Sequence, residues 1–368
     1  MKVTFPHMGS LAIPMKALLE EAGLEVVLPP PTSKRTLTLG SRYAPEFACL
    51  PLKINLGNYL EALALGADTI IMAGGVGPCR FGYYGEVQRE ILRSLGKDCD
   101  FLIFEPPAGD FKGLASTCRR LFAGCRPAGI LRGAKIAWAK ARAVDKLWQV
   151  SLWARPREVE RGRTSKIIRK LYHKLDQACE MKRIRRIVRE GIEELKSQAK
   201  GEPKAHIALV GEIYVVLDPF SNQYIEERLG EMGVEVSRTI YLSQWIVHHL
   251  VLPTFRLHRP NRSLGLASGY LNYAVGGHGL ETVANTVLAA RRRFDGVVQL
   301  APFTCMPEIV AASILPRVSK GEGISVLTLF LDEHTGEAGL VTRLEAFVDM
   351  LLRQQRQRRQ GHGILSWA

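Results

Sequence analysis

The feature that most constrains the fold is an alternation of short apolar strands with helix-length segments. In the first third of the chain, apolar runs typical of strands lie at 2–6, 25–28, 69–73 and 100–104. Helical patterns separate these runs, and several of them end at a glycine, the residue that commonly follows the last turn of a helix. Strands separated by helices predict a parallel sheet with right-handed crossovers.

The same alternation returns after residue 205, with strand patterns at 206–210, 234–236, 296–300 and 324–330. Between the two blocks the strand signals vanish and charged helix formers dominate. At 368 residues the chain is also too long for one ordinary core. The predicted fold class is therefore α/β, with two Rossmann-like lobes joined by a helical insert and a cleft between them as the expected site. The predicted segments are an N-terminal lobe at 1–133, a basic helical insert at 134–204, a C-terminal lobe at 205–353 and a basic tail at 354–368.

The net charge of +14 is unevenly distributed. Residues 151–204 hold 16 Lys and Arg against 8 Asp and Glu, and residues 353–368 add four Arg with no acid, which leaves +2 elsewhere. This pattern predicts a docking surface or an exposed helical face. Apart from Tyr172, no aromatic residues are interleaved with the charges as a base-stacking platform would need, which argues against nucleic acid as a partner. No apolar run reaches membrane-span length and the start does not resemble a signal peptide, so we expect no membrane partner and a cytoplasmic protein.

The chain has seven cysteines, an odd and widely spaced set that does not suggest a disulfide framework. Cys49, Cys79 and Cys305 each lie in a turn next to or near a proline and just before a helical pattern. Helix N-termini stabilise thiolates, so these three could converge on a metal site that spans the cleft and keeps one coordination position open. Soft thiolates select Zn, Cu(I) or iron–sulfur clusters. The alternative is that each is a small buried residue. We interpret the remaining four as structural: Cys99, Cys118, Cys125 and Cys179.

Five motifs together resemble the 2-hydroxyacyl-CoA dehydratase and double-cubane-cluster superfamily, and within it the iron–sulfur proteins related to CoA-substrate-specific enzyme activases. They cover both predicted lobes. The motifs are Phe47-Ala48-Cys49-Leu50-Pro51-Leu52-Lys53, Gly77-Pro78-Cys79-Arg80-Phe81-Gly82, Gly276-Gly277-His278-Gly279-Leu280-Glu281-Thr282, Pro302-Phe303-Thr304-Cys305-Met306-Pro307-Glu308 and Asp332-Glu333-His334-Thr335-Gly336-Glu337-Ala338-Gly339.

The resemblance implies a low-potential [4Fe–4S] cluster held by three cysteines, with a fourth ligand from outside the protein. Cys49, Cys79 and Cys305 match the family's ligand positions. A double-cubane cluster is a further possibility, although the few cysteines speak against one within a single chain. The resemblance also implies a separate ATP-hydrolysing activator that supplies single electrons. The chain has no GxxxxGK[ST] motif, and 74–82 lacks the GxGxxG spacing, so we expect it to accept electrons and not to hydrolyse ATP.

The expected activity is that of a dehydratase-like or reductase component, a lyase or oxidoreductase of anaerobic metabolism, acting on an acyl-CoA or another small molecule. The candidate catalytic residues are His278 and Glu308, and Lys53 and Arg80 could hydrogen-bond cluster sulfurs or substrate. We expect the activator to dock on the basic segment 155–204, and we expect a dimer. The alternative function is a non-catalytic iron–sulfur or zinc protein that acts as a scaffold or maturation factor.

Overall fold

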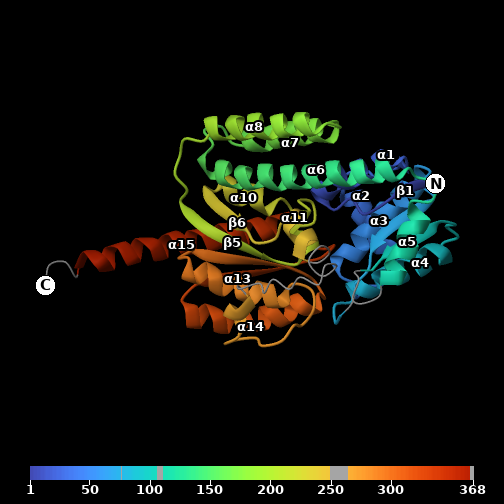
Figure 1. The fold of residues 1–368 in the computed structure, drawn as a ribbon. Coiled ribbons are helices and arrows are strands. Elements are labelled where there is room, and N and C mark those ends of the chain that lie inside the picture. Colours follow the sequence, from blue (N-terminus) through green and yellow to red (C-terminus); the bar gives the residue numbers. More distant parts are fainter. Residues whose placement is uncertain (76, 106–110, 249–263, 365–368) are drawn as a thin grey trace.

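The computed structural model describes residues 1–75, 77–105, 111–248 and 264–364 and contains two lobes, each built on a four-stranded parallel sheet (Figure 1). The strand order is β2-β1-β3-β4 in the N-terminal lobe and β6-β5-β7-β8 in the C-terminal lobe. In each sheet the second strand lies on one side of the first strand, and the third and fourth strands lie on its other side. The predicted α/β class with two Rossmann-like lobes is confirmed.

The N-terminal lobe packs its helices closely on a short-stranded sheet. A Cβ atom on Gly40 would lie 1.7 Å from the carbonyl oxygen of Lys53, so the second and third helices approach to a distance that only glycine permits. The strands are β1 (Lys2–Thr4), β2 (Glu25–Val26), β3 (Thr69–Ala73) and β4 (Asp100–Phe104). The helices are α1 (Ala12–Ala22), α2 (Lys34–Tyr43), α3 (Leu50–Ala64), α4 (Phe81–Ser94) and α5 (Phe111–Leu121).

The C-terminal lobe has longer strands, and β7 is buried along its whole length. Such burial requires helices on both faces of the sheet, which is the rule for parallel sheets. The strands are β5 (Ala205–Gly211), β6 (Val234–Arg238), β7 (Gly296–Pro302) and β8 (Ser325–Leu331). The helices are α9 (Ile213–Leu217), α10 (Ile225–Glu231), α11 (Leu242–Ile246), α13 (Gly279–Arg291), α14 (Met306–Glu322) and α15 (Glu337–Ile364).

A helical insert joins the lobes, made of α6 (Pro127–Ala154), α7 (Arg163–Asp176) and α8 (Met181–Ser197). At about 1.5 Å per residue, α6 is roughly 42 Å long. It packs on α1 of the N-terminal lobe and on β6 and α11 of the C-terminal lobe, so both lobes share it as a support. Figure 1 shows α7 and α8 stacked on the side of α6 that faces away from α13 and α14.

Element boundaries differ from the sequence expectation in a few places. The sequence patterns do not indicate α2 or α5, and α4 begins at Phe81, ahead of the helical pattern at 85–95. The closing helix α15 continues to Ile364, so it covers residues 354–364 of the segment 354–368 that we predict as a tail. Gln and Arg are good helix formers, so nothing in 354–360 ends the helix. None of the described helices has the length and apolar character needed to cross a lipid bilayer.

Candidate metal centre

Cys49 and Cys305 occupy equivalent places in the two lobes. Cys49 is the N-cap of α3 and Cys305 is the N-cap of α14, and each helix has a proline in its first turn. Proline suits that position because the first-turn N–H groups have no partner within the helix. Both cysteines are buried, with 9% and 6% of their surface exposed. Each thiol therefore lies at the positive end of a helix dipole.

Cys79 precedes α4 and is covered by a loop from the C-terminal lobe. Gly276 and Gly277 have φ angles of +85° and +47°. A Cβ atom on Gly276 would lie 2.8 Å from the backbone nitrogen of Cys79, and one on Gly277 would lie 3.8 Å from the Cys79 Sγ. Both the left-handed backbone and the close approach favour glycine there. The loop at 276–277 of the C-terminal lobe therefore packs directly against the turn that contains Cys79.

Arg80 connects the turns that carry all three cysteines. Its guanidinium donates to the carbonyl oxygen of Phe47 at 3.3 Å, to the Thr304 Oγ1 at 3.1 Å and to the Thr304 carbonyl oxygen. The Thr304 hydroxyl in turn donates to the Phe47 carbonyl oxygen at 2.9 Å. Phe47 lies two residues before Cys49, and Thr304 directly precedes Cys305. The planar fork of arginine can reach both turns at once, which an ammonium group cannot do in the same way.

A second polar contact crosses the lobes beside Cys49. The Lys53 ammonium, on the second turn of α3, forms a salt bridge with Glu333 of the C-terminal lobe. It also donates to the carbonyl oxygen of Glu46 at 3.0 Å. Lys53 is only 4% exposed, so the pair is largely desolvated and is costly to break. It fixes the turn at 46–49 against the opposite lobe.

Burial and neighbouring negative charge raise the pKa values of all three thiols. Burial raises the pKa of Cys49 to about 12, and the Tyr84 hydroxyl opposes that rise in pKa. Burial also raises the pKa values of Cys79 and Cys305, and the nearby carboxylate of Glu212 raises them further. A negative charge on Cys49 raises the pKa of Cys305, and one on Cys79 raises that of Cys49. These thiols therefore stay protonated until a cation lowers their pKa values.

The three cysteines do not form a compact single-ion site. Among the described residues, no group of three or more His, Cys, Asp or Glu side chains is close enough to hold one metal ion. In a [4Fe–4S] cluster each cysteine binds a different iron, so the ligands lie farther apart than those of a single zinc ion. Cys49 and Cys305 are buried at the N-caps of α3 and α14, and Cys79 is half-buried one residue before the N-cap of α4.

Glu308 and His278, the two candidate catalytic residues, lie behind this site. Glu308 is fully buried in the first turn of α14 and accepts hydrogen bonds from Thr282 at 3.0 Å and from Gln299 Nε2 at 2.8 Å. Burial raises its pKa to about 8. These bonds tie α14 to α13 and β7 behind Cys305. His278 is buried as the N-cap residue of α13 and directly follows the loop that covers Cys79.

Two residues near the cysteines are not among the site residues that the sequence predicts. Tyr84, on α4, places its hydroxyl 3.0 Å from the Cys49 Sγ. Glu212 directly follows β5 and accepts a hydrogen bond from the Val215 amide at 3.1 Å. Burial raises the pKa of Glu212 to about 7. The rule that ligands lie beyond the carboxyl ends of strands points to Glu212, whereas Tyr84 depends on how α4 is turned toward α3.

If the three cysteines hold a cluster, we expect Arg80→Gln to loosen it without unfolding the chain. The variant loses charge-assisted hydrogen bonds between the turns, worth about 1.5–3 kcal/mol each. Iron should then leave the reconstituted protein to a chelator at least about tenfold faster, since about 1.4 kcal/mol corresponds to a factor of ten. Arg93→Gln is the matched control, because Arg93 pairs with Glu90 on the same exposed face of its helix. Equal iron loss from both variants would show that Arg80 does not position the turns.

The structure thus places Cys49 within electrostatic range of Cys79 and of Cys305. The other four cysteines lie in different surroundings: Cys99, Cys118 and Cys125 are half-buried and Cys179 is exposed. A comparison with protein-family models found no match to this chain, and a comparison with curated proteins found none either.

Proposed function

We propose that this chain is an iron–sulfur protein of the 2-hydroxyacyl-CoA dehydratase type, with a [4Fe–4S] cluster on Cys49, Cys79 and Cys305. In this proposal it accepts electrons from a separate ATP-hydrolysing activator and uses them for reductive or dehydratase-like chemistry on an acyl-CoA or other small molecule. The observation that carries the proposal is the junction of the three cysteine turns, from two lobes, through Arg80 and Thr304. When bound, such a cluster supplies low-potential single-electron transfer at an iron with an open coordination position.

The surrounding residues would tune the charge of the thiolates. The Tyr84 hydroxyl can donate to the Cys49 Sγ, and the backbone N–H groups of Leu52 and Glu308, in the first turns of α3 and α14, lower the pKa values of Cys49 and Cys305. Hydrogen bonds and helix dipoles of this kind offset negative charge on sulfur. Glu212 acts in the opposite direction, because its carboxylate disfavours added negative charge at all three cysteines. Buried carboxylates near a redox centre favour a low potential.

An apolar rim surrounds the same turns and supports a protein partner at this site. Five large apolar side chains on or next to the cysteine turns are strongly exposed: Phe47 (69%), Tyr83 (68%), Phe303 (55%), Ile309 (44%) and Met306 (43%). Single exposed apolar residues are ordinary, but several on adjoining turns are typical of interaction surfaces. Aromatic residues and methionine are also enriched at the cores of interfaces.

This rim is where we propose that the electron donor docks. Electron transfer weakens steeply with distance, so the donor has to approach the cysteines closely. The basic segment 155–204 forms α7 and α8, which Figure 1 shows on the outer side of α6, away from the start of α14. Its positive charge can attract an acidic partner over about 10 Å at moderate salt, but it does not offer a short path to the thiols.

Anaerobic reconstitution with iron and sulfide tests the proposal. We expect about four iron and four acid-labile sulfide per chain, and an EPR signal that appears on reduction at low potential. Protein purified without oxygen that instead retains zinc, and takes up no sulfide on reconstitution, would favour the alternative of a zinc scaffold. Metal quantitation on the same sample separates the two outcomes.

The open coordination position leads to a second expectation. Three thiolates leave one iron of the cluster without a protein ligand. Cyanide or an added thiol should therefore shift the Mössbauer parameters of about one iron in four and leave the others unchanged. A spectrum that does not respond to either reagent would indicate a closed electron-transfer centre, and it would remove the reason to expect substrate chemistry at the cluster.

A further inference from the structure

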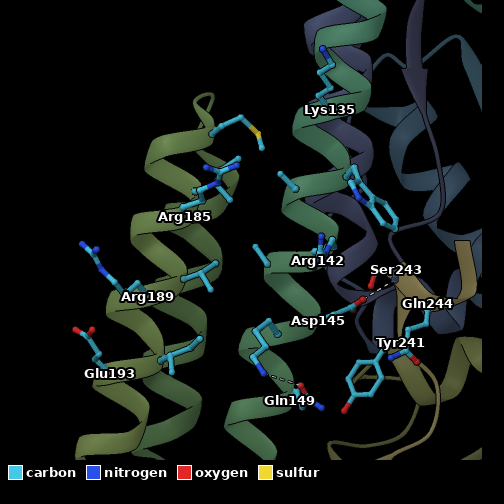
Figure 2. Close-up of a pocket in the computed structure, with 18 residues that line it drawn as sticks. Lys135, Arg142, Asp145, Gln149, Arg185, Arg189, Glu193, Tyr241, Ser243 and Gln244 are labelled. Atoms are coloured by element: carbon cyan, nitrogen blue, oxygen red, sulfur yellow. Dashed lines mark hydrogen bonds between the residues drawn. The ribbon is translucent and has the colours of Figure 1, made fainter. Parts of the chain in front are cut away.

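A groove lies on the helical insert and extends from α8 across α6 to the segment around α11. It has a volume of about 790 Å³ and is bordered by α6, α8 and the segment around α11 (Figure 2). Its apolar lining includes Trp138, Val188 and Ile192, and Met181 lies at the start of α8. Trp138 and Met181 are 37% and 39% exposed. A concave apolar surface of this size is therefore open to solvent.

Positively charged side chains lie on both sides of the apolar residues that line the groove. Figure 2 shows Lys135 and Arg142 on α6, and Arg185 and Arg189 on α8. Lys146 adds a fifth cation on α6. Across the described part of the chain, none of these five forms a salt bridge with an Asp or Glu, although the insert carries several such pairs elsewhere. The groove therefore presents a row of cations with no acidic partner within the chain.

The two acidic residues of the groove do not neutralise this charge. Asp145 accepts a hydrogen bond from the backbone amide of Ser243 at 2.7 Å, which holds α11 against α6. Glu193 lies near the C-terminal end of α8, about two turns beyond Arg185. With five cations and two acids, the lining has a net charge of +3. An acidic ligand complements it.

The shape of the groove selects among acidic ligands. Two helices lying side by side form a channel that a third helix fills by ridges-into-grooves packing. A membrane is flat and cannot reach an apolar floor set between two rows of long basic side chains. The chain's own closing helix is excluded by charge, because its distal part carries Arg353, Arg356 and Arg358 and no acid after Asp349.

We propose that the groove between α6 and α8 binds an acidic amphipathic helix of a partner protein. The apolar face of that helix packs on Trp138, Met181 and Val188, and carboxylates on its flanks pair with Arg142, Arg185 and Arg189. Recognition of this kind depends on apolar residues spaced at i, i+3, i+4 and i+7 in the ligand. This site is separate from the cysteines, so it holds whether or not they bind a cluster.

Titration calorimetry on the full chain tests the proposal. The probe is a synthetic helix of about 18 residues, or five turns, with Leu on one face and Glu on both flanks. We expect saturable binding of one peptide per chain, weakened at least about tenfold between roughly 50 and 500 mM salt. A peptide of the same composition in scrambled order should not bind. Lack of binding by the ordered peptide at about 100 μM would overturn the proposal.

Two variants locate the binding. Arg185→Glu with Arg189→Glu should weaken binding at least about tenfold. Both side chains are exposed, so the fold should tolerate the change. Arg186→Glu is the control, because Arg186 is on the same helix but outside the groove, where it pairs with Glu190. Equal losses of affinity in the two cases would show that the overall charge of α8 controls binding, and they would contradict binding in the groove.

Vesicles of anionic lipid that bind in place of the peptide, with the same dependence on Arg185 and Arg189, would assign the surface to a membrane and overturn the proposal. Iron-free protein should give the same result, so failure here is distinguishable from failure of the cluster proposal.

Discussion

Replacing Cys305 by Ser should leave the chain folded and remove most of its iron. After anaerobic reconstitution we expect iron to fall from about four per chain to less than about one, because a cluster held by two thiolates is not retained. Serine is close in size to cysteine, but its hydroxyl is a hard ligand that does not ionise near neutral pH. Cys49→Ser and Cys79→Ser should have the same effect. Metal analysis and circular dichroism on each variant provide the two readouts.

The remaining cysteines supply matched controls. Cys179 is exposed between α7 and α8, and Cys99 is half-buried just before β4. Substitution of either by Ala should leave the iron content unchanged, and the same holds for Cys118 and Cys125. Full iron occupancy in Cys305→Ser would end the case for a site shared by the two lobes, because the remaining two cysteines both belong to the N-terminal lobe.

The parallel lobes could be predicted because their signals are local. Short apolar runs such as 69–72 and 296–300 are buried on both faces, and a glycine follows the last turn of helices such as α1. The α2 helix shows where this approach fails. Its sequence is polar and contains Gly40, which disfavours a helix. That glycine is required by the close approach of Lys53 on α3, a tertiary contact that no local pattern reveals.

The candidate site also contains some residues that local sequence patterns indicate and others that depend on tertiary contacts. The position of each cysteine before a helix can be seen in the sequence, and so can Glu212 after a strand. The link from Arg80 to Thr304 joins residues that are 224 positions apart, and it depends on how the two lobes meet. Tyr84 reaches Cys49 only because α4 packs beside α3. Spacing along the chain carries no information about either contact.

The helical insert should depend strongly on one buried ion pair. Arg238 at the end of β6 donates to Glu226 on α10 at 2.9 Å, and the Trp148 indole N–H of α6 donates to the same carboxylate at 3.2 Å. The Arg238 guanidinium also lies over the Trp148 ring, 5.2 Å from its centroid. Both charged residues are almost fully buried. The pair therefore joins the insert to the sheet of the C-terminal lobe.

We expect Arg238→Met to lower the free energy of unfolding by about 3–5 kcal/mol, because it leaves the buried Glu226 carboxylate without the guanidinium that donates to it, and Arg155 acts on Glu226 only through space. Chemical denaturation followed by circular dichroism measures this loss. Arg132→Met is the control, since Arg132 pairs with Glu21 at the surface, and such pairs contribute about 0–1 kcal/mol.

The double variant Arg238→Met with Glu226→Leu separates the loss of a favourable pair from the cost of an unpaired charge. Removing both charges removes the desolvation cost of each, so the double variant should be more stable than Arg238→Met alone. It should not reach the stability of the parent, because Trp148 then keeps a buried N–H without its acceptor. If Arg238→Met costs less than about 1 kcal/mol, the attachment of α6 rests on apolar packing around Leu147 and Trp148, and the insert is held as a hydrophobic layer alone.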